Sequence, residues 1–271
     1  MEANVKTQLK KFLEDTELFV LDMDGTFFLE QDVIDGALDF INTVNRKGKK
    51  FMFFTNNSSK APEDYMEKLE KAGCPVSRRQ IMTSGDVSIC YLKRNYPSAS
   101  VYLAGTPQFE KSVREAGIRL TEQEPDIVLI SFDMTLTYDK LMRCCSFIRQ
   151  GSLFLATHPD INCPVKDGFI PDCGAICAAV SLSTGREPKY LGKPYRETVE
   201  MIADQMHTAT AKIAFVGDRL YTDIAAGVEH GGMGFLVLTG EATAEDVKAS
   251  KIKPTAVYQS LGEMADYMNG A

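Results

Sequence analysis

The chain has 271 residues, of which 44% are hydrophobic and 25% are charged, and its net charge is −7. These values are typical of a soluble globular protein, and the acidic balance without a basic stripe argues against nucleic acid as a partner. No apolar stretch approaches the ~20 residues of a membrane span, and the polar N-terminus lacks the apolar core of a signal peptide. Seven cysteines without a Cys-x-x-Cys pair indicate reduced thiols, so we expect a cytoplasmic protein with no membrane partner.

The first predicted strand covers residues 18–21, a run of four apolar residues that is typical of a strand buried on both faces. Asp22 and Asp24 follow it, and Gly25 can then turn the backbone away. Strand geometry sends both carboxylates to the same side, although the turn can spread them. Buried carboxylates are costly without a cation nearby, so the pair is either a polar turn that ends the strand or part of a charged site.

Three further elements complete the first portion of the chain. The spacing of apolar residues predicts a helix over about 36–47, and a second buried strand covers residues 51–54. This strand ends in polar residues, Thr55 and Asn56. Pro62 then begins a helix that Gly73 closes.

A self-contained pattern of strands and helices occupies about residues 83–185. Its predicted strands are 101–104, 127–130 and 153–156, and its predicted helices are about 107–116, 138–150 and 173–184. Three such alternations make a small α/β domain of about 100 residues. We therefore predict a discontinuous core domain, residues 1–83 and 186–271, with an inserted domain at residues 84–185.

The last portion resumes the first pattern. Gly192, Lys193 and Pro194 precede a helix, and a buried strand at residues 213–216 ends in Gly217 and Asp218. A helix from about residue 222, strands at 235–238 and 256–258, and a terminal helix follow. The whole alternation predicts an α/β fold with a doubly wound parallel sheet.

Three buried strands thus end in polar residues that can take part in chemistry. In open parallel α/β sheets, the ligand crevice lies outside the carboxyl ends of the strands. If these strands are neighbours in the sheet, Asp22, Thr55 and Asp218 meet in one place. We therefore expect one shared site at this edge.

The acidic residues at this edge imply a cation. Two unit charges about 4 Å apart repel by about 4 kcal/mol at an effective dielectric constant of about 20. The predicted edge gathers Asp22, Asp24, Asp218 and Asp223, and a hard divalent cation with oxygen ligands, Mg²⁺ rather than zinc, relieves their repulsion. Lys193 at a helix start adds positive charge, and Thr55 and Asn56 add a hydroxyl and an amide. Such a set suits a phosphoryl group.

Four motifs carry a resemblance to a known family. They are Asp22-Met-Asp24-Gly-Thr, Thr55-Asn-Asn-Ser-Ser, Gly192-Lys193-Pro194 and Gly217-Asp218-Arg-Leu-Tyr-Thr-Asp223. In this order they resemble the motifs of the haloacid dehalogenase-like hydrolases. The second and fourth look like the NagD-type branch, which includes p-nitrophenylphosphatases, with phosphoglycolate and pyridoxal phosphate phosphatases nearby. The resemblance implies a Rossmann-like core with an inserted, smaller α/β cap domain.

The resemblance also implies roles for the motif residues. Asp22 is the implied nucleophile that forms an aspartyl-phosphate, and Asp24 is the implied acid and base that serves both half-reactions. Mg²⁺ is held by Asp22, by the backbone carbonyl of Asp24 and by Asp218, with Asp223 in support. The phosphoryl oxygens are held by Thr55, Asn56 and Lys193. The implied activity is that of a Mg²⁺-dependent phosphatase acting on small-molecule phosphate monoesters.

Two departures from the family pattern lie in the predicted cap. His158 stands where the branch usually has asparagine, and Asp172-Cys173 replaces a more glycine-rich pair. His158 is either a substrate contact or a hydrogen-bonded polar residue at a strand end. These positions leave the substrate open among sugar phosphates, phosphoglycolate, nucleotides and pyridoxal phosphate, and a homodimer also stays open. The alternatives to a phosphatase are a phosphotransferase or mutase of the same superfamily, and a non-catalytic protein that binds a phosphorylated ligand.

Overall fold

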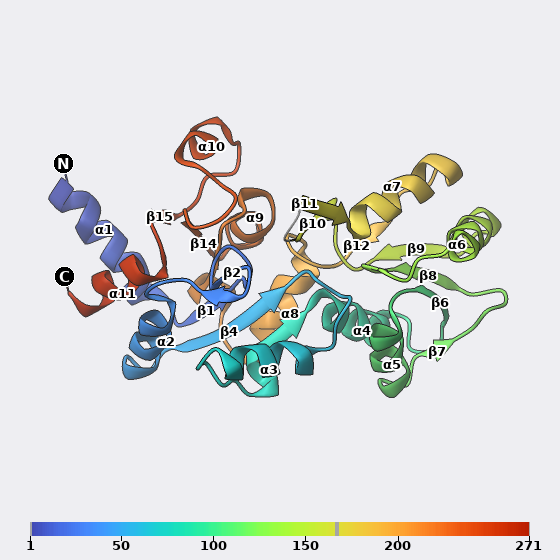
Figure 1. The fold of residues 1–271 in the computed structure, drawn as a ribbon, viewed down its shortest axis with the longest axis horizontal. Helices are drawn as coiled ribbons and strands as arrows, with labels where there is room; N and C mark the ends of the chain where they lie inside the picture. Colours follow the sequence, from blue (N-terminus) through green and yellow to red (C-terminus); the bar gives the residue numbers. More distant parts are fainter. Residues whose placement is uncertain (1, 166–167, 271) are drawn as a thin grey trace. The chain divides into compact units, whose positions relative to one another are not determined.

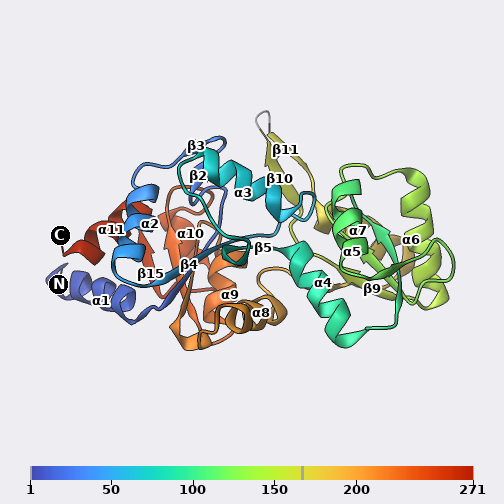
Figure 2. The same cartoon turned by 90° about the horizontal axis from the view of Figure 1, so that it is seen from below.

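The chain divides into two compact units in the computed structural model, which describes residues 2–165 and 168–270. Figures 1 and 2 show the elements of both units from two sides. The first unit runs to Phe54, resumes over Met66–Met82 and continues from Thr198. The second unit contains Thr55–Tyr65 and Thr83–Glu197. The domain boundaries expected from the sequence stay a prediction.

The first unit is built on a six-stranded sheet with the order β15-β14-β13-β1-β4-β5. β1 lies between β13 and β4 and is parallel to both, so that Leu18 is the register partner of Ile213 and of Lys50. The strands are β1 (Leu18–Leu21), β4 (Lys50–Thr55), β5 (Ile81–Thr83), β13 (Ile213–Gly217), β14 (Met233–Val237) and β15 (Ala256–Tyr258). The parallel pairing of strands far apart in the sequence confirms the predicted α/β, Rossmann-like class.

Helices connect these strands and supply apolar faces to the core. They are α1 (Glu2–Asp15), α2 (Ala37–Arg46), α3 (Pro62–Lys71), α8 (Arg196–Met206), α9 (Ala225–Val228), α10 (Ala244–Ala249) and α11 (Leu261–Asn269), with short turns η1 (Arg78–Gln80), η2 (Thr210–Lys212) and the π-helical η3 (Leu220–Ile224). A small antiparallel hairpin joins β2 (Phe28–Leu29) to β3 (Asp32–Val33). On α2, Phe40 is fully buried and its ring meets Phe19 of β1 edge-on, with centroids 5.2 Å apart. Helix and sheet thus share one core.

The second unit has its own five-stranded parallel sheet, with the order β12-β9-β8-β6-β7. Its strands are β6 (Ser100–Ala104), β7 (Arg119–Leu120), β8 (Ile127–Ile130), β9 (Leu153–Ala156) and β12 (Lys189–Tyr190), and a separate antiparallel hairpin pairs β10 (Asn162–Val165) with β11 (Gly168–Pro171). Its helices are α4 (Ser84–Asn95), α5 (Pro107–Glu115), α6 (Tyr138–Gln150) and α7 (Cys173–Thr184).

Alternate residues of these strands face two separate cores. On β8, Val128 and Ile130 pack with residues of α6 and α7, whereas Ile127 and Leu129 pack with residues of α4 and α5. The period of two along a strand places consecutive side chains on opposite faces, so both faces of the sheet are covered by helices. None of the helices in the described ranges is long and apolar enough to cross a bilayer.

Candidate active site

Three carboxylates gather at the carboxyl edge of the core sheet. Asp22 directly follows β1, and its amide donates to Val216 O on β13 at 2.9 Å. Asp218 directly follows β13, and η3 returns Asp223 to the same edge. Oxygens of Asp22, Asp218 and Asp223 all lie within 4.8 Å of one another. The parallel pairing of β1 with β13 therefore brings together acids that are almost 200 positions apart in the sequence.

Asp218 is the most constrained of these acids. Its Oδ2 accepts a hydrogen bond from Glu241 N at 2.7 Å, while its buried Oδ1 has no hydrogen-bond partner among the described residues. Burial, with the added repulsion of Asp22 and Asp223, raises the pKa of Asp218 to about 7. An unsatisfied, buried carboxylate oxygen is costly, so it indicates a missing electropositive partner.

Glycines let the backbone close around this carboxylate. A Cβ atom on Gly25 would lie 2.3 Å from Asp218 Oδ2, and one on Gly240 would lie 2.0 Å from the same oxygen. Gly25 also has a φ of +82°, which residues with a side chain rarely adopt. The oxygen donors, the repulsion between them and the unsatisfied Oδ1 together fit a hard divalent cation such as Mg²⁺. Asp22, Asp218 and Asp223 are the side chains that can hold it.

Asp24 lies in a tight turn beyond Asp22 and is exposed. Gly25 N donates to Phe28 O at 2.7 Å, and Phe28 N donates to Met23 O at 2.8 Å. The Asp24 carboxylate pairs with the ammonium group of Lys68 on α3, at 3.6 Å. Desolvation between these elements raises the pKa of Asp24, Lys68 opposes that rise, and Asp22 adds to it. A proton-transfer group needs this combination of access and adjustable pKa.

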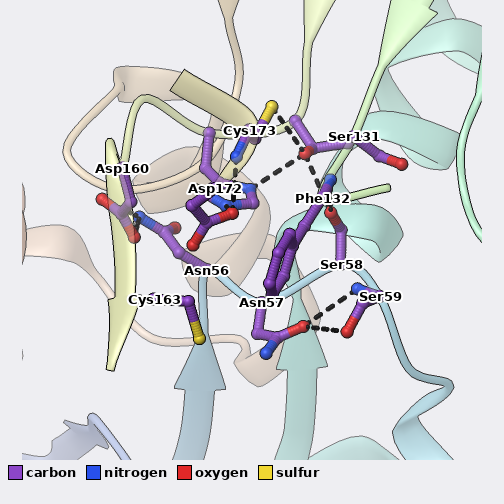
Figure 3. Close-up of polar contacts among 12 residues, drawn as sticks. Asn56, Asn57, Ser58, Ser59, Ser131, Phe132, Asp160, Cys163, Asp172 and Cys173 are labelled. Carbon is purple, nitrogen blue, oxygen red and sulfur yellow. Dashed lines mark hydrogen bonds and ion pairs between the residues drawn. The ribbon is translucent and has the colours of Figure 1, made fainter. Parts of the chain in front are cut away.

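The second unit contains the remaining motif residues, Thr55, Asn56 and Lys193. Asn56 Oδ1 accepts from Lys193 N at 2.9 Å, and Asn56 Nδ2 donates to Lys193 O at 3.0 Å. The same Nδ2 lies 3.3 Å from Asp160 Oδ2, a contact visible in Figure 3. Thr55 Oγ1 accepts from Asn57 N at 3.1 Å. The Asn56 side chain thus clamps the backbone of the Lys193 loop, a contact that the motif alone does not reveal.

A buried network supports this clamp from behind. His158 is completely buried, its Nε2 lies 2.8 Å from Asp172 Oδ1, and its Nδ1 lies 3.2 Å from Ser84 Oγ. The Ser84 hydroxyl in turn donates to Asn56 O at 2.5 Å. Asp172 and the adjacent Cys173, at the start of α7, are drawn in Figure 3. Of the two sequence-based interpretations of His158, the structure favours the hydrogen-bonded polar residue at a strand end.

The structure therefore assembles the predicted site residues in two groups. The first unit holds Asp22, Asp24, Asp218 and Asp223, and the second holds Thr55, Asn56 and Lys193. Sequence reasoning did not single out Lys68, because nothing in its helix distinguishes it from the neighbouring lysines. It also did not pair His158 with Asp172, although the unusual residue at each position was the available signal.

Comparison with known proteins adds independent support for the family. Residues 19–119 match the family model described as haloacid dehalogenase-like hydrolase, and residues 190–264 match a second model, described as HAD-hydrolase-like. The acid sugar phosphatase of Staphylococcus aureus (strain MRSA252) is 35% identical over 246 residues, which are 90% of this chain and 95% of that protein.

Solved structures agree with this match. The 4-nitrophenylphosphatase from Thermotoga maritima is 43% identical, with a TM-score of 0.91 over 94% of this chain and 98% of its own. NagD from E. coli K-12 is 28% identical, with a TM-score of 0.86 over 92% of this chain and 98% of its own. These matches confirm the resemblance seen in the four motifs. The chain therefore belongs to the haloacid dehalogenase-like hydrolases, in the branch of NagD and the p-nitrophenylphosphatases, and is an enzyme of that family.

Proposed function

We propose that this enzyme is a Mg²⁺-dependent phosphatase that hydrolyses small-molecule phosphate monoesters through an aspartyl-phosphate on Asp22. The observation that carries the proposal is the carboxylate cluster of Asp22, Asp218 and Asp223, whose oxygens lie within 4.8 Å of one another at the carboxyl edge of the core sheet. The relatives named as phosphatases support the same reaction class.

In this mechanism the two acids after β1 divide the work. The Asp22 carboxylate attacks phosphorus, the bond from phosphorus to the ester oxygen breaks, and the phosphoryl group is left on Asp22. Asp24 gives a proton to the departing alcohol and then takes one from the water that hydrolyses the aspartyl-phosphate. The exposure of Asp24 and its raised pKa suit a group that must gain and lose a proton.

The motif residues would also bind the cation and the phosphoryl group. Asp22, the backbone carbonyl of Asp24 and Asp218 would hold the cation, with Asp223 in support. When bound, Mg²⁺ would neutralise the carboxylates and polarise the phosphoryl group. Thr55, Asn56 and Lys193 would hold the phosphoryl oxygens. The Asn56 clamp, whose Oδ1 accepts from Lys193 N at 2.9 Å, would fix where the Lys193 loop presents its charge.

The name of the acid sugar phosphatase relative makes sugar phosphates the first substrate class to test. The proposed partner is a small-molecule phosphate ester, and the proposal includes neither nucleic acid nor a membrane. None of the seven cysteines, all of which lie in the described residues, forms a disulfide, and this fits a cytoplasmic location.

The decisive variant is Asp22→Asn, which keeps the shape of the side chain but removes the nucleophile. We expect phosphate release from p-nitrophenyl phosphate and from sugar phosphates to fall by more than about 1000-fold. The charge-matched control is Asp39→Asn, on the exposed side of α2, which should retain wild-type turnover. Native turnover by Asp22→Asn would contradict the nucleophile assignment.

Product analysis separates the alternatives. Inorganic phosphate released in equal amount to the alcohol supports hydrolysis. A phosphorylated acceptor in place of free phosphate would instead support a phosphotransferase or mutase. Binding of many phosphate esters without any release would support a non-catalytic binding protein.

A further inference from the structure

Lys68 reaches from α3 to the turn that carries Asp24. Its Nζ lies 3.6 Å from Asp24 Oδ1, 4.0 Å from the centroid of the Phe28 ring, and 3.4 Å from the carbonyl oxygen of Glu30. All four residues belong to the first unit, so these contacts lie within one compact body. One ammonium group thus contacts the turn and the β2–β3 hairpin at three separate points.

The neighbouring lysine shows that this placement is not a general property of the helix end. Lys71 stands in the same last turn of α3, where a positive charge is favourable. Its side chain is 73% exposed and pairs with Glu67 of its own helix, whereas the side chain of Lys68 is only 28% exposed. The Phe28 ring, which is fully buried, offers Lys68 a fixed cation–π surface.

Asp24 needs such a partner because its backbone contacts do not fix its carboxylate. The bonds from Gly25 N to Phe28 O and from Phe28 N to Met23 O hold the main chain of the turn. The Asp24 side chain is 55% exposed, so its rotamer is otherwise free to change. An exposed ion pair contributes little to folding stability. The main effect of the Lys68 contact is therefore to orient the Asp24 carboxylate.

We propose that Lys68 is a positioning residue that holds the Asp24 carboxylate in the rotamer required for proton transfer to the departing alcohol. This inference rests on the proposed function, in which Asp24 is the acid. General acid catalysis depends on the acid lying within hydrogen-bond reach of the leaving oxygen, and a displacement of about 1 Å costs up to about 100-fold in rate. Lys68 has no contact with the substrate in this scheme and acts through Asp24.

The dependence on the leaving group tests this role. An alkoxide needs a proton to depart, whereas p-nitrophenolate leaves without one. The quantity to measure is kcat/KM, because it reports the steps up to alcohol departure and excludes the later hydrolysis of the aspartyl-phosphate. The variants are Lys68→Met, which keeps length without charge, Lys68→Arg, which keeps the charge, and Lys71→Met as the matched control on the same helix.

We expect Lys68→Met to lower kcat/KM by about 10- to 100-fold for the best sugar phosphate of a panel, and by less than about 3-fold for p-nitrophenyl phosphate. Lys68→Arg should restore most of the loss, and Lys71→Met should match the wild type. An equal fall for both substrates, or no fall for either, would overturn the inference. If Lys68→Met does not fold, Lys68→Gln carries the same comparison.

A double-variant cycle provides a second test. If Lys68 acts through Asp24, adding Lys68→Met to Asp24→Asn should cause no further loss with the sugar phosphate. Additive losses would overturn the inference. A wild-type enzyme that releases phosphate from neither substrate would contradict the proposed function itself, whereas additive losses in an active enzyme contradict only the role of Lys68.

Discussion

His158 places a titratable group where water cannot reach it. Both ring nitrogens lie within hydrogen-bond distance of side chains, with Nε2 2.8 Å from Asp172 Oδ1 and Nδ1 2.9 Å from Thr157 Oγ1. Burial alone would lower the pKa of His158, but the Cys173 sulfur and the Asp172 carboxylate outweigh it and raise the pKa to about 9. These neighbours therefore favour the imidazolium form of His158 in the folded state.

This residue predicts a pH dependence of stability. Because the folded-state pKa of about 9 exceeds the ordinary value of 6.5, the stabilisation is complete below pH 6.5 and is lost as the pH rises through about 9. The quantity to compare is the free energy of unfolding of the wild type minus that of His158→Asn. We expect this difference to be larger at pH 6 than at pH 9.5, by up to about 3 kcal/mol. Denaturant unfolding of both proteins at the two pH values measures this difference. A gap that does not change with pH would contradict the charged state assigned to His158.

At the scale of elements, the loop after β12 depends on a close approach of backbone. Gly192 N donates to Thr157 O at 2.7 Å. A Cβ atom on Gly192 would lie 2.6 Å from Asn56 Oδ1 and 2.7 Å from Thr157 O. Any side chain at this position must therefore push the Asn56 amide away from Lys193.

We accordingly expect Gly192→Ala to lower kcat/KM for phosphate esters by about 10-fold or more, because it displaces the Lys193 loop. Steady-state kinetics measures the loss, and circular dichroism checks that the fold is kept. If the clash acts through Asn56, Gly192→Ala should add little to the loss caused by Asn56→Ala. Wild-type kinetics for Gly192→Ala would show that the loop tolerates the displacement.

Elements with a clear apolar run or stripe were predictable from the sequence. The expected strands at 127–130, 153–156 and 256–258 and the helices at 138–150 and 173–184 have the observed bounds. Each is an apolar run or stripe bounded by polar or turn residues, so local pattern and burial agree. The helix expected from about residue 222 instead begins with the π-helical η3, Leu220–Ile224, which carries Asp223 back to the sheet edge.

Elements that form through contacts with distant parts of the chain, without a local apolar pattern, were not predictable. No helix was expected at α4, Ser84–Asn95, because its apolar residues form no clear stripe, although the Thr83–Asp86 capping box marks its start. The hairpins β2–β3 and β10–β11 are also too short to show a period. At the site, Asp22 and Asp218 were predictable because each directly follows a buried strand. The Lys68–Asp24 ion pair was not, because it joins a helix face to a turn through space.

At the scale of the whole molecule, we expect the proposed cation to stabilise the folded state. The carboxylates of Asp22, Asp218 and Asp223 lie close together at this edge of the sheet, and the buried Asp218 Oδ1 has no hydrogen-bond partner among the described residues. Repulsion between these groups destabilises the fold unless a cation is bound. A ligand that binds only the folded state adds about 2.7 kcal/mol at a concentration 100 times its Kd. We therefore expect Mg²⁺ to raise the melting temperature relative to protein in excess chelator.

The matched variants for that measurement are Asp218→Asn and Asp39→Asn. The first removes a proposed ligand and should lose the Mg²⁺-dependent rise, and the second removes an exposed charge on α2 and should keep it. Differential scanning fluorimetry with and without chelator measures each shift. Identical melting temperatures of the wild type in both conditions would contradict the metal site.

The central position of β1 has a consequence for how the chain is made. β1 is synthesised well before its neighbour β13, which begins only at Ile213. All residues of the second unit, which ends at Glu197, are synthesised before that neighbour exists. Because compact units fold as their residues become available, we expect the second unit to fold first, while β1 lacks one of its two neighbouring strands until β13 has been synthesised.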